Sequence, residues 1–213
     1  MQSYLNGTSW EFSEIVVVDD GSRDGTAKVA LNAGVRLLRN PGNRGKGYSV
    51  RHGMLEAKGE WLLFSDADLS TPIEELDKLW SAVGRERAQA AIGSRDLDRS
   101  LIGVRQPLFR EMGGRFFNLV IRLITGLPFH DTQCGFKLFE RAAAREIFRR
   151  QRTERFGFDV EVLFIAQRLG YRTVEVPVRW NDVAGTKVKL WGAAAAFLDP
   201  LKVRWNGLTG KYK

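Results

Sequence analysis

The sequence predicts an α/β fold in which a mostly parallel sheet is flanked by helices on both faces. Short apolar runs alternate with helical segments through the first half of the chain, a rhythm typical of parallel strands joined by helices. Two of these runs end in acidic pairs, as strands beside a binding site often do. The 213 residues, 44% of them hydrophobic and 27% charged, suffice for one globular domain.

Four strands and three helices are expected in the first half. Each strand is an apolar or β-branched run bounded by turn residues, and Thr71-Pro72 marks the start of the third helix. In chain order we expect a strand at residues 14–18, a helix at 26–33, a strand at 35–38, a helix at 47–57, a strand at 61–65, a helix at 73–83 and a strand at 88–92.

The second half is less regular. The charged stretch 94–106 and the stretch 126–135 predict loops. Helices are expected at 107–125, 141–149, 160–169 and 190–203, and strands at 136–139 and 173–178. Because no segment resembles a linker, we expect residues 1–213 to form a single domain.

The formal net charge of +8 favours polyanionic partners: nucleic acid, anionic lipid head groups or phosphate-bearing substrates. The chain has no recognisable nucleic-acid-binding motif, so we expect no nucleic acid among its partners. Its longest wholly apolar stretch, near residues 190–198, is too short to span a membrane. Cys134 is the only cysteine, which excludes an internal disulfide and favours a reducing compartment.

Asp66 and Asp68 follow the strand predicted at 61–65. Two carboxylates two residues apart at a strand end can share a hard divalent cation, and oxygen ligands favour Mg²⁺ or Mn²⁺ over zinc. Such a cation would neutralise a diphosphate leaving group. The alternative is a solvated turn that caps the following helix.

Two further motifs lie beside predicted elements. Asp19 and Asp20 end the first strand, where a carboxylate can accept hydrogen bonds from a base or a ribose; the alternative is an Asx turn. The glycine-rich stretch 43–47 opens a helix, so its backbone and Lys46 could meet a phosphate. The alternative for this stretch is an ordinary loop.

In this order and spacing, the motifs resemble the nucleotide-binding half of family-two inverting glycosyltransferases, which have the Rossmann-like GT-A fold. The resemblance rests on VVVDDGSRDGT, RGKG, RHG, A-x-G and DAD, at residues 16–26, 44–47, 51–53, 57–59 and 66–68. In the second half, DTQCGFKLF, Trp180, GTK and the C-terminal stretch resemble dolichyl-phosphate β-glucosyltransferases and related polyprenyl-phosphate enzymes; they lie at residues 131–139, 180, 185–187 and 202–212.

The resemblance implies a metal-dependent hexosyltransferase that moves glucose from UDP-glucose, with inversion, onto dolichyl or another polyprenyl phosphate. The alternatives are the same reaction with GDP-mannose and a truncated, non-catalytic relative that binds nucleotide or lipid. The nucleotide-sugar half would cover about residues 1–93 and the acceptor and membrane half about 94–213. The resemblance further implies a cytoplasmic protein, peripheral at the cytosolic face of a membrane.

The same resemblance implies roles for individual residues. Catalytic roles fall to Asp131, Asp68 and Arg95, and a Mg²⁺ or Mn²⁺ site to Asp66 and Asp68. Substrate binding falls to Asp19, Asp20, Lys46, Asp66, Arg105, Arg110, Gln133, Lys137, Trp180 and Lys187. The arginines would pair with the acceptor phosphate, which is largely ionised at pH 7 and needs little help from a base. For Asp159 and Glu161 the choice between a catalytic base and a structural role stays open, and we favour the structural role.

The predicted helix 107–125 is amphipathic, with Arg115 and Arg122 on its polar side and Phe116 and Leu123 opposite. A basic face opposite an apolar one suits a helix that lies in a membrane interface. The alternative is a helix whose apolar side packs on the protein core.

One difference from the family is also expected. Its members normally begin with a strand that carries a Pro-x-Tyr-Asn-Glu-like element, and we expect that first strand to be missing, with Met1 in the helix before Ile15. A strand missing from a parallel sheet leaves backbone edges and apolar faces exposed.

Overall fold

The computed structural model describes residues 1–104, 108–183 and 198–213, and of residues 108–111 the backbone alone. The strands are β1 (Val16–Asp19), β2 (Arg36–Arg39), β3 (Trp61–Ser65), β4 (Ala90–Ser94), β5 (Ile102–Val104), β6 (Phe136–Glu140), β7 (Thr173–Pro177) and β8 (Trp180–Asn181). The α-helices are α1 (Gln2–Asn6), α2 (Thr26–Asn32), α3 (Lys46–Glu56), α4 (Leu76–Glu86), α5 (Leu108–Thr125), α6 (Arg141–Arg150), α7 (Phe158–Arg168) and α9 (Leu198–Leu208).

The elements expected from the sequence are present, with most ends shifted by a residue or two, as is usual for helix and strand boundaries. The third expected helix begins as a short 3-10 turn, η1 (Ile73–Glu75), before α4. The first part of the helix expected at 190–203 lies outside the described residues, and α9 begins at Leu198. No helix within the described ranges is long and apolar enough to cross a membrane.

The central sheet has the order β3–β6–β4–β7 and is mixed. Three of the five strand pairs among the described residues are parallel, as expected for a mostly parallel arrangement. β6 is antiparallel to both β3 and β4, whereas β7 runs parallel to β4. β6 belongs in the middle of the sheet because its side chains are buried on both faces: Phe136 and Leu138 on one, Phe139 on the other.

The orientation of β6 decides where the site forms. Since β6 is antiparallel to β3 and β4, its first residue lies at the edge of the sheet where β3 and β4 end. The loop that leads into β6 therefore meets the residues that follow β3 and β4. Ligands in sheets of this type bind at that edge.

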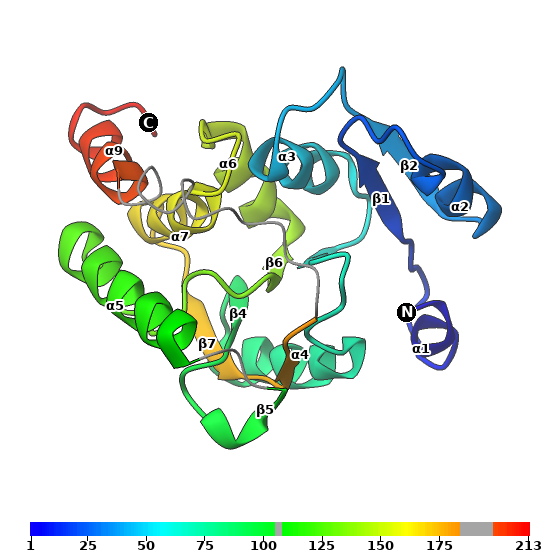
Figure 1. Ribbon diagram of the computed structural model, residues 1–213, viewed down its shortest axis with the longest axis horizontal. Helices are drawn as coiled ribbons and strands as arrows, with labels where there is room; N and C mark the ends of the chain where they lie inside the picture. The colour runs from blue at the N-terminus through cyan, green and yellow to red at the C-terminus, as the bar shows by residue number, and fades with distance from the viewer. Residues whose placement is uncertain (105–107, 184–197) are drawn as a thin grey trace.

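Helices cover both faces of the central sheet (Figure 1). α3, α6 and α7 lie on one face, where Val50, Ile147 and Leu163 form the larger core cluster with Phe139. α4 lies on the other face, and Leu79 packs there in a second cluster that includes Phe136 and Leu138. Burying apolar surface on both faces stabilises the sheet and holds its end in place.

β1 and β2 pair with each other in parallel but form a sheet separate from β3, so the single continuous sheet that the first half predicts is wrong. Among the described residues no strand precedes Val16, and β1 and β3 each pair along one edge only. One backbone edge of β1 and one of β3 are therefore unpaired among the described residues.

The stretch 94–106 was expected to be a loop, and here too the structure differs. It contains a 3-10 turn, η2 (Arg99–Leu101), and β5, which pairs in parallel with β8. Ile102 lies opposite Trp180 in this pair. The strand is short and its partner is distant in sequence, so no local pattern could predict it.

Candidate active site

Asp66 and Lys46 bring the motif after β3 together with the glycine-rich loop. The Lys46 ammonium lies 2.8 Å from Asp66 Oδ1 and 5.6 and 5.9 Å from the ring centres of Phe64 and Phe158. Burial works to lower the pKa of Lys46, but the carboxylates of Asp159 and Asp66 outweigh it and raise that pKa. Lys46 is therefore a fixed positive charge beside the acidic motif.

The Asp20 carboxylate holds the glycine-rich loop in place through hydrogen bonds. Its carboxylate accepts hydrogen bonds from Arg44 N, Gly45 N and Asn40 Nδ2, each at 2.8 Å. Burial opposes ionisation, yet these donors keep the pKa of Asp20 below its ordinary value. Gly45 adopts a φ of 108°, which only glycine reaches without strain. Asp20 thus shapes the loop that carries Lys46, and its predicted role in substrate binding stays a prediction.

Asp68 is exposed and lies at a strained turn. Its Oδ1 accepts a 3.0 Å hydrogen bond from Ser70 N, so the turn that the sequence offered as an alternative is formed. Leu69, between them, has a φ of 53°, which is uncommon for leucine and often found at functional sites.

The donor set at this edge fits a metal that binds together with a substrate. Among the described residues no three His, Cys, Asp or Glu side chains converge on one point, so Asp66 and Asp68 supply at most two carboxylates. Mg²⁺ is commonly held by one or two carboxylates, with phosphate oxygens and water completing its shell. The residues present therefore fit Mg²⁺ or Mn²⁺ shared with a diphosphate.

Gly135 leaves the room that Asp66 needs. Gly135 O accepts a 2.9 Å hydrogen bond from Asp66 N, and a Cβ on Gly135 would overlap the Asp66 carboxylate. We expect Gly135→Ala to displace that carboxylate and to lower the free energy of unfolding by on the order of 1–3 kcal/mol.

Thermal unfolding and Mn²⁺ titration of Gly135→Ala check this expectation. Gly84→Ala is the matched control, because a Cβ on Gly84 meets open space. If Gly135→Ala unfolded at the wild-type temperature and responded to Mn²⁺ as the wild type does, the close packing of Gly135 against the Asp66 carboxylate would be contradicted.

Asp131 and Arg95 form the second part of the site. Arg95 Nε and Nη2 donate to the two Asp131 oxygens at 2.6 and 2.8 Å, while Arg95 N and Gln133 N each donate at 3.1 Å. Although Asp131 is fully buried, the Arg95 charge and these donors hold its pKa below the ordinary value. Four donors occupy this carboxylate, which lies against the Arg95 guanidinium, and its catalytic role stays a prediction.

Glu175, on β7, fixes the loop that carries Asp131. Its carboxylate accepts from Asp131 N at 2.8 Å and from His130 N at 2.9 and 3.0 Å. Glu175 is not among the site residues predicted from the sequence; the available signal was an acidic side chain inside a β-branched strand.

Arg95 lies over Trp180 with its guanidinium carbon 5.5 Å from the ring centre, and 27% of its side chain is exposed. Within the described residues its Nη1 makes no hydrogen bond. The structure thus brings together two predicted residues, Arg95 and Trp180, and leaves a guanidinium edge available for an anion.

The Lys137 side chain is buried within electrostatic range of Asp131, and its predicted role in substrate binding stays a prediction. The alternation of β6 turns its side chain toward α7, where the buried ammonium donates to Asp159 and, at 2.6 Å, to Cys134 O. Burial raises the pKa of Asp159 although Lys137 acts to lower it. Lys137 and Asp159 are therefore an internal ion pair.

Glu161 is likewise structural. Its carboxylate accepts hydrogen bonds from Thr153 N and Tyr212 Oη at 2.7 Å and from Arg152 N at 3.0 Å, which ties α7 to the segment before it and to the C-terminus.

Cys134 is buried, and burial raises the pKa of its thiol to about 12, so it is unsuited to be a nucleophile.

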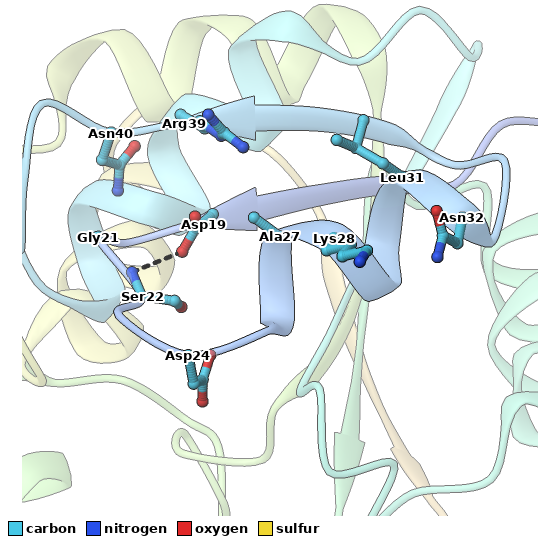
Figure 2. A pocket seen from close by; sticks show the side chains of 10 residues that line it. All are labelled: Asp19, Gly21, Ser22, Asp24, Ala27, Lys28, Leu31, Asn32, Arg39 and Asn40. Atoms are coloured by element: carbon cyan, nitrogen blue, oxygen red, sulfur yellow. Dashed lines mark hydrogen bonds between the residues drawn. The ribbon is translucent and has the colours of Figure 1, made fainter.

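A hollow of about 520 Å³ with polar and apolar lining lies beside the end of β1 (Figure 2). Asp19 contributes to its wall, and Asp19 Oδ1 accepts a 2.8 Å hydrogen bond from Ser22 N, three residues on, so its carboxylate closes the turn after β1. Arg39 and Lys28 add positive charge to the lining, whereas Asp66 and Asp68 take no part in it. The hollow and the acidic motif are separate features.

The remaining predicted residues are only partly placed. Arg105 and Lys187 lie outside the described residues, as does the side chain of Arg110. Gln133 is half-buried in the loop next to Asp131.

The fold, with its acidic motif at this edge of the sheet, is that of the GT-A class of glycosyltransferases. The crystal structure of mannosyl-3-phosphoglycerate synthase from Rubrobacter xylanophilus superposes with a TM-score of 0.64 at 18% identity, covering 93% of this chain and 65% of that chain. Glucosyl-3-phosphoglycerate synthase from Mycobacterium tuberculosis, in complex with Mn²⁺, UDP-glucose and phosphoglyceric acid, gives 0.59 at 19% identity, with 91% and 69% covered.

Sequence similarity narrows the class. The Glycosyl transferase family 2 profile matches residues 2–148, and the chain belongs to this family. A dolichyl-phosphate beta-glucosyltransferase of Drosophila melanogaster is 42% identical over 188 residues, covering 82% of this chain and 57% of the relative. The Mus musculus protein of the same name is 37% identical over 214 residues, covering 94% and 66%. The chain therefore spans about three fifths of the length of these relatives.

Proposed function

We propose that this protein transfers glucose from UDP-glucose, with inversion, to dolichyl phosphate or another polyprenyl phosphate. The observation that carries the proposal is the Arg95–Asp131 pair, which presents a fixed cation at the same sheet edge as Asp66 and Asp68. An acidic motif for a metal and diphosphate beside a cation for a second anion suits two phosphate-bearing substrates. The names of the relatives support the choice of glucose and dolichyl phosphate.

On the donor side, Asp66 and Asp68 would hold Mg²⁺ or Mn²⁺, which when bound neutralises the charge of the departing diphosphate. Lys46, fixed against Asp66, adds a second positive charge to the same region. Asp19 would receive the nucleoside at the end of β1. The Mn²⁺ and UDP-glucose bound to the mycobacterial neighbour support a donor of this type.

On the acceptor side, the phosphate brings its own ionised oxygen, so this reaction needs alignment and charge screening more than a strong base. Arg95 would pair with that phosphate through its free guanidinium edge. Asp131 would act through Arg95, and Glu175 through the backbone of Asp131. Because the acceptor is a membrane lipid, we place the protein peripherally at a membrane, on the cytosolic face where sugar nucleotides are available.

The direct test is incubation with radiolabelled UDP-glucose or GDP-mannose and with either polyprenyl phosphate or unphosphorylated polyprenol. We expect label in lipid from UDP-glucose and the phosphate alone, because the alcohol lacks an ionised oxygen. Transfer from GDP-mannose alone would favour the mannosyl alternative, and equal transfer to the alcohol would overturn the phosphate-acceptor mechanism. Nucleotide binding without any transfer would favour the non-catalytic alternative.

A further inference from the structure

Helix α5 presents a continuous apolar stripe to solvent. Met112, Phe116, Leu119 and Leu123 are 69%, 60%, 49% and 77% exposed. Their spacing of four, three and four residues places them on one side of the helix. The opposite side is buried, as Ile121 shows. The sequence left open whether the apolar side packs on the core; the structure leaves this stripe uncovered by any described residue.

Helix α9 carries a second stripe of the same kind. Leu198, Leu201, Trp205 and Leu208 are 65%, 52%, 63% and 66% exposed, and their spacing again selects one helix side. Val203, on the other side, is buried in the larger core cluster. A helix that packs only against the core of its own chain normally exposes polar side chains on its solvent side.

The two helices are neighbours although their sequences are far apart. α5 and α9 contact each other and lie at one end of the molecule, while α2 lies at the other (Figure 1). Adjacent helices that both expose apolar stripes are typical of a surface that binds a partner.

The charge around the stripes favours a lipid surface over a protein groove. In residues 112–125 and 198–213 the basic residues are Arg115, Arg122, Lys202, Arg204, Lys211 and Lys213, against one acidic residue, Asp199. Basic residues beside exposed leucines and a tryptophan are typical of segments that lie in an anionic membrane interface.

We propose that α5 and α9 together form a docking surface for an anionic lipid bilayer, with both apolar stripes in the interface. The surface adjoins the candidate active site. On the inner side of α5, Asn118 Oδ1 accepts a 3.3 Å hydrogen bond from Thr132 Oγ1, and Thr132 follows Asp131. The α5 stripe and the Asp131 loop are thus separated by one helix, about 10–12 Å across. Docking would bring lipid head groups near Arg95, but the proposal does not depend on the reaction proposed above.

Flotation with phosphatidylcholine vesicles, with and without phosphatidylserine, tests the proposal on the whole chain. Two variants each replace two of the four exposed side chains of one stripe: Phe116→Ser with Leu123→Ser, and Leu201→Ser with Trp205→Ser. We expect each to lower partitioning onto anionic vesicles by at least about tenfold, because each removes two interfacial apolar groups. Added salt is expected to weaken the wild-type interaction.

The matched control is Phe12→Ser with Val29→Ser. These side chains are 54% and 68% exposed, but lie outside both helices. Thermal unfolding of every variant separates lost docking from lost folding. Unchanged flotation of either stripe variant would overturn the two-helix surface. A wild-type dimer that the stripe variants disrupt, without any vesicle binding, would assign the surface to a second copy of the chain.

Discussion

Replacing Asp131 with Asn is expected to reduce transfer to polyprenyl phosphate by about 10²–10³-fold while leaving UDP binding nearly unchanged. The carboxylate accepts two hydrogen bonds from the Arg95 guanidinium, and an amide offers one acceptor and one donor in its place. Arg95 would then lose its fixed orientation toward the acceptor. Because Asp131 is fully buried, we also expect a loss of on the order of 3 kcal/mol in the free energy of unfolding.

Steady-state kinetics, UDP titration and thermal unfolding of four variants test the positioning role. Arg95→Ala should lose the turnover that Asp131→Asn loses, and Arg95→Lys should recover only part of it, since lysine cannot form the bidentate pair. Glu175→Gln keeps the shape of the side chain that holds the Asp131 backbone and should produce a smaller defect. Full activity in Asp131→Asn would contradict the proposed role, and so would equal loss of UDP binding.

Asp68→Ala is expected to reduce turnover by roughly 10²–10³-fold and to weaken the dependence of UDP binding on Mn²⁺ or Mg²⁺. Asp68 is exposed and makes one hydrogen bond, to Ser70 N, so the variant should stay folded. Excess chelator should have a similar effect on the wild-type protein. The measurements are turnover against metal concentration and calorimetric titration of UDP with and without Mn²⁺.

Asp98→Ala is a close control for this experiment. Asp98 is also exposed and likewise accepts a 3.0 Å hydrogen bond from the backbone nitrogen two residues on, Ser100 N. Asp98 also accepts a hydrogen bond from Ser100 Oγ and caps the 3-10 turn η2, outside the acidic motif after β3. Undiminished turnover in chelator, or equal losses in both variants, would remove the metal role from Asp68.

Sequence patterns predicted the helices and strands that depend mainly on residues close together in the sequence. Strands such as β3 are short apolar runs between turn residues, and α5 is a long amphipathic stretch, so their periodicity predicted them almost to the residue. The positions of Asp66 and Asp68 followed from the end of β3 alone. A resemblance in spaced motifs added the family, which no single element could have specified.

Other features depended on contacts between distant segments. Whether Lys137 faces a ligand or α7 is set by the pairing of β6 between β3 and β4, which its own sequence does not encode. Asp131 lies in a specific motif, but the motif does not show that Arg95 pairs with both of its oxygens. The role of Glu175 required β7 to lie beside the loop that it holds.

The sequence by itself therefore determined the α/β class, the approximate positions of most elements, the acidic motif after β3 and the amphipathic character of α5, because hydrophobic periodicity and turn chemistry act over a few residues. Tertiary structure alone decided the antiparallel place of β6, the pairing of Asp131 with Arg95 and the exposure of the α5 and α9 stripes. These depend on which surfaces become buried against each other, and burial sets both the partners of a charged group and the side of a helix left to solvent.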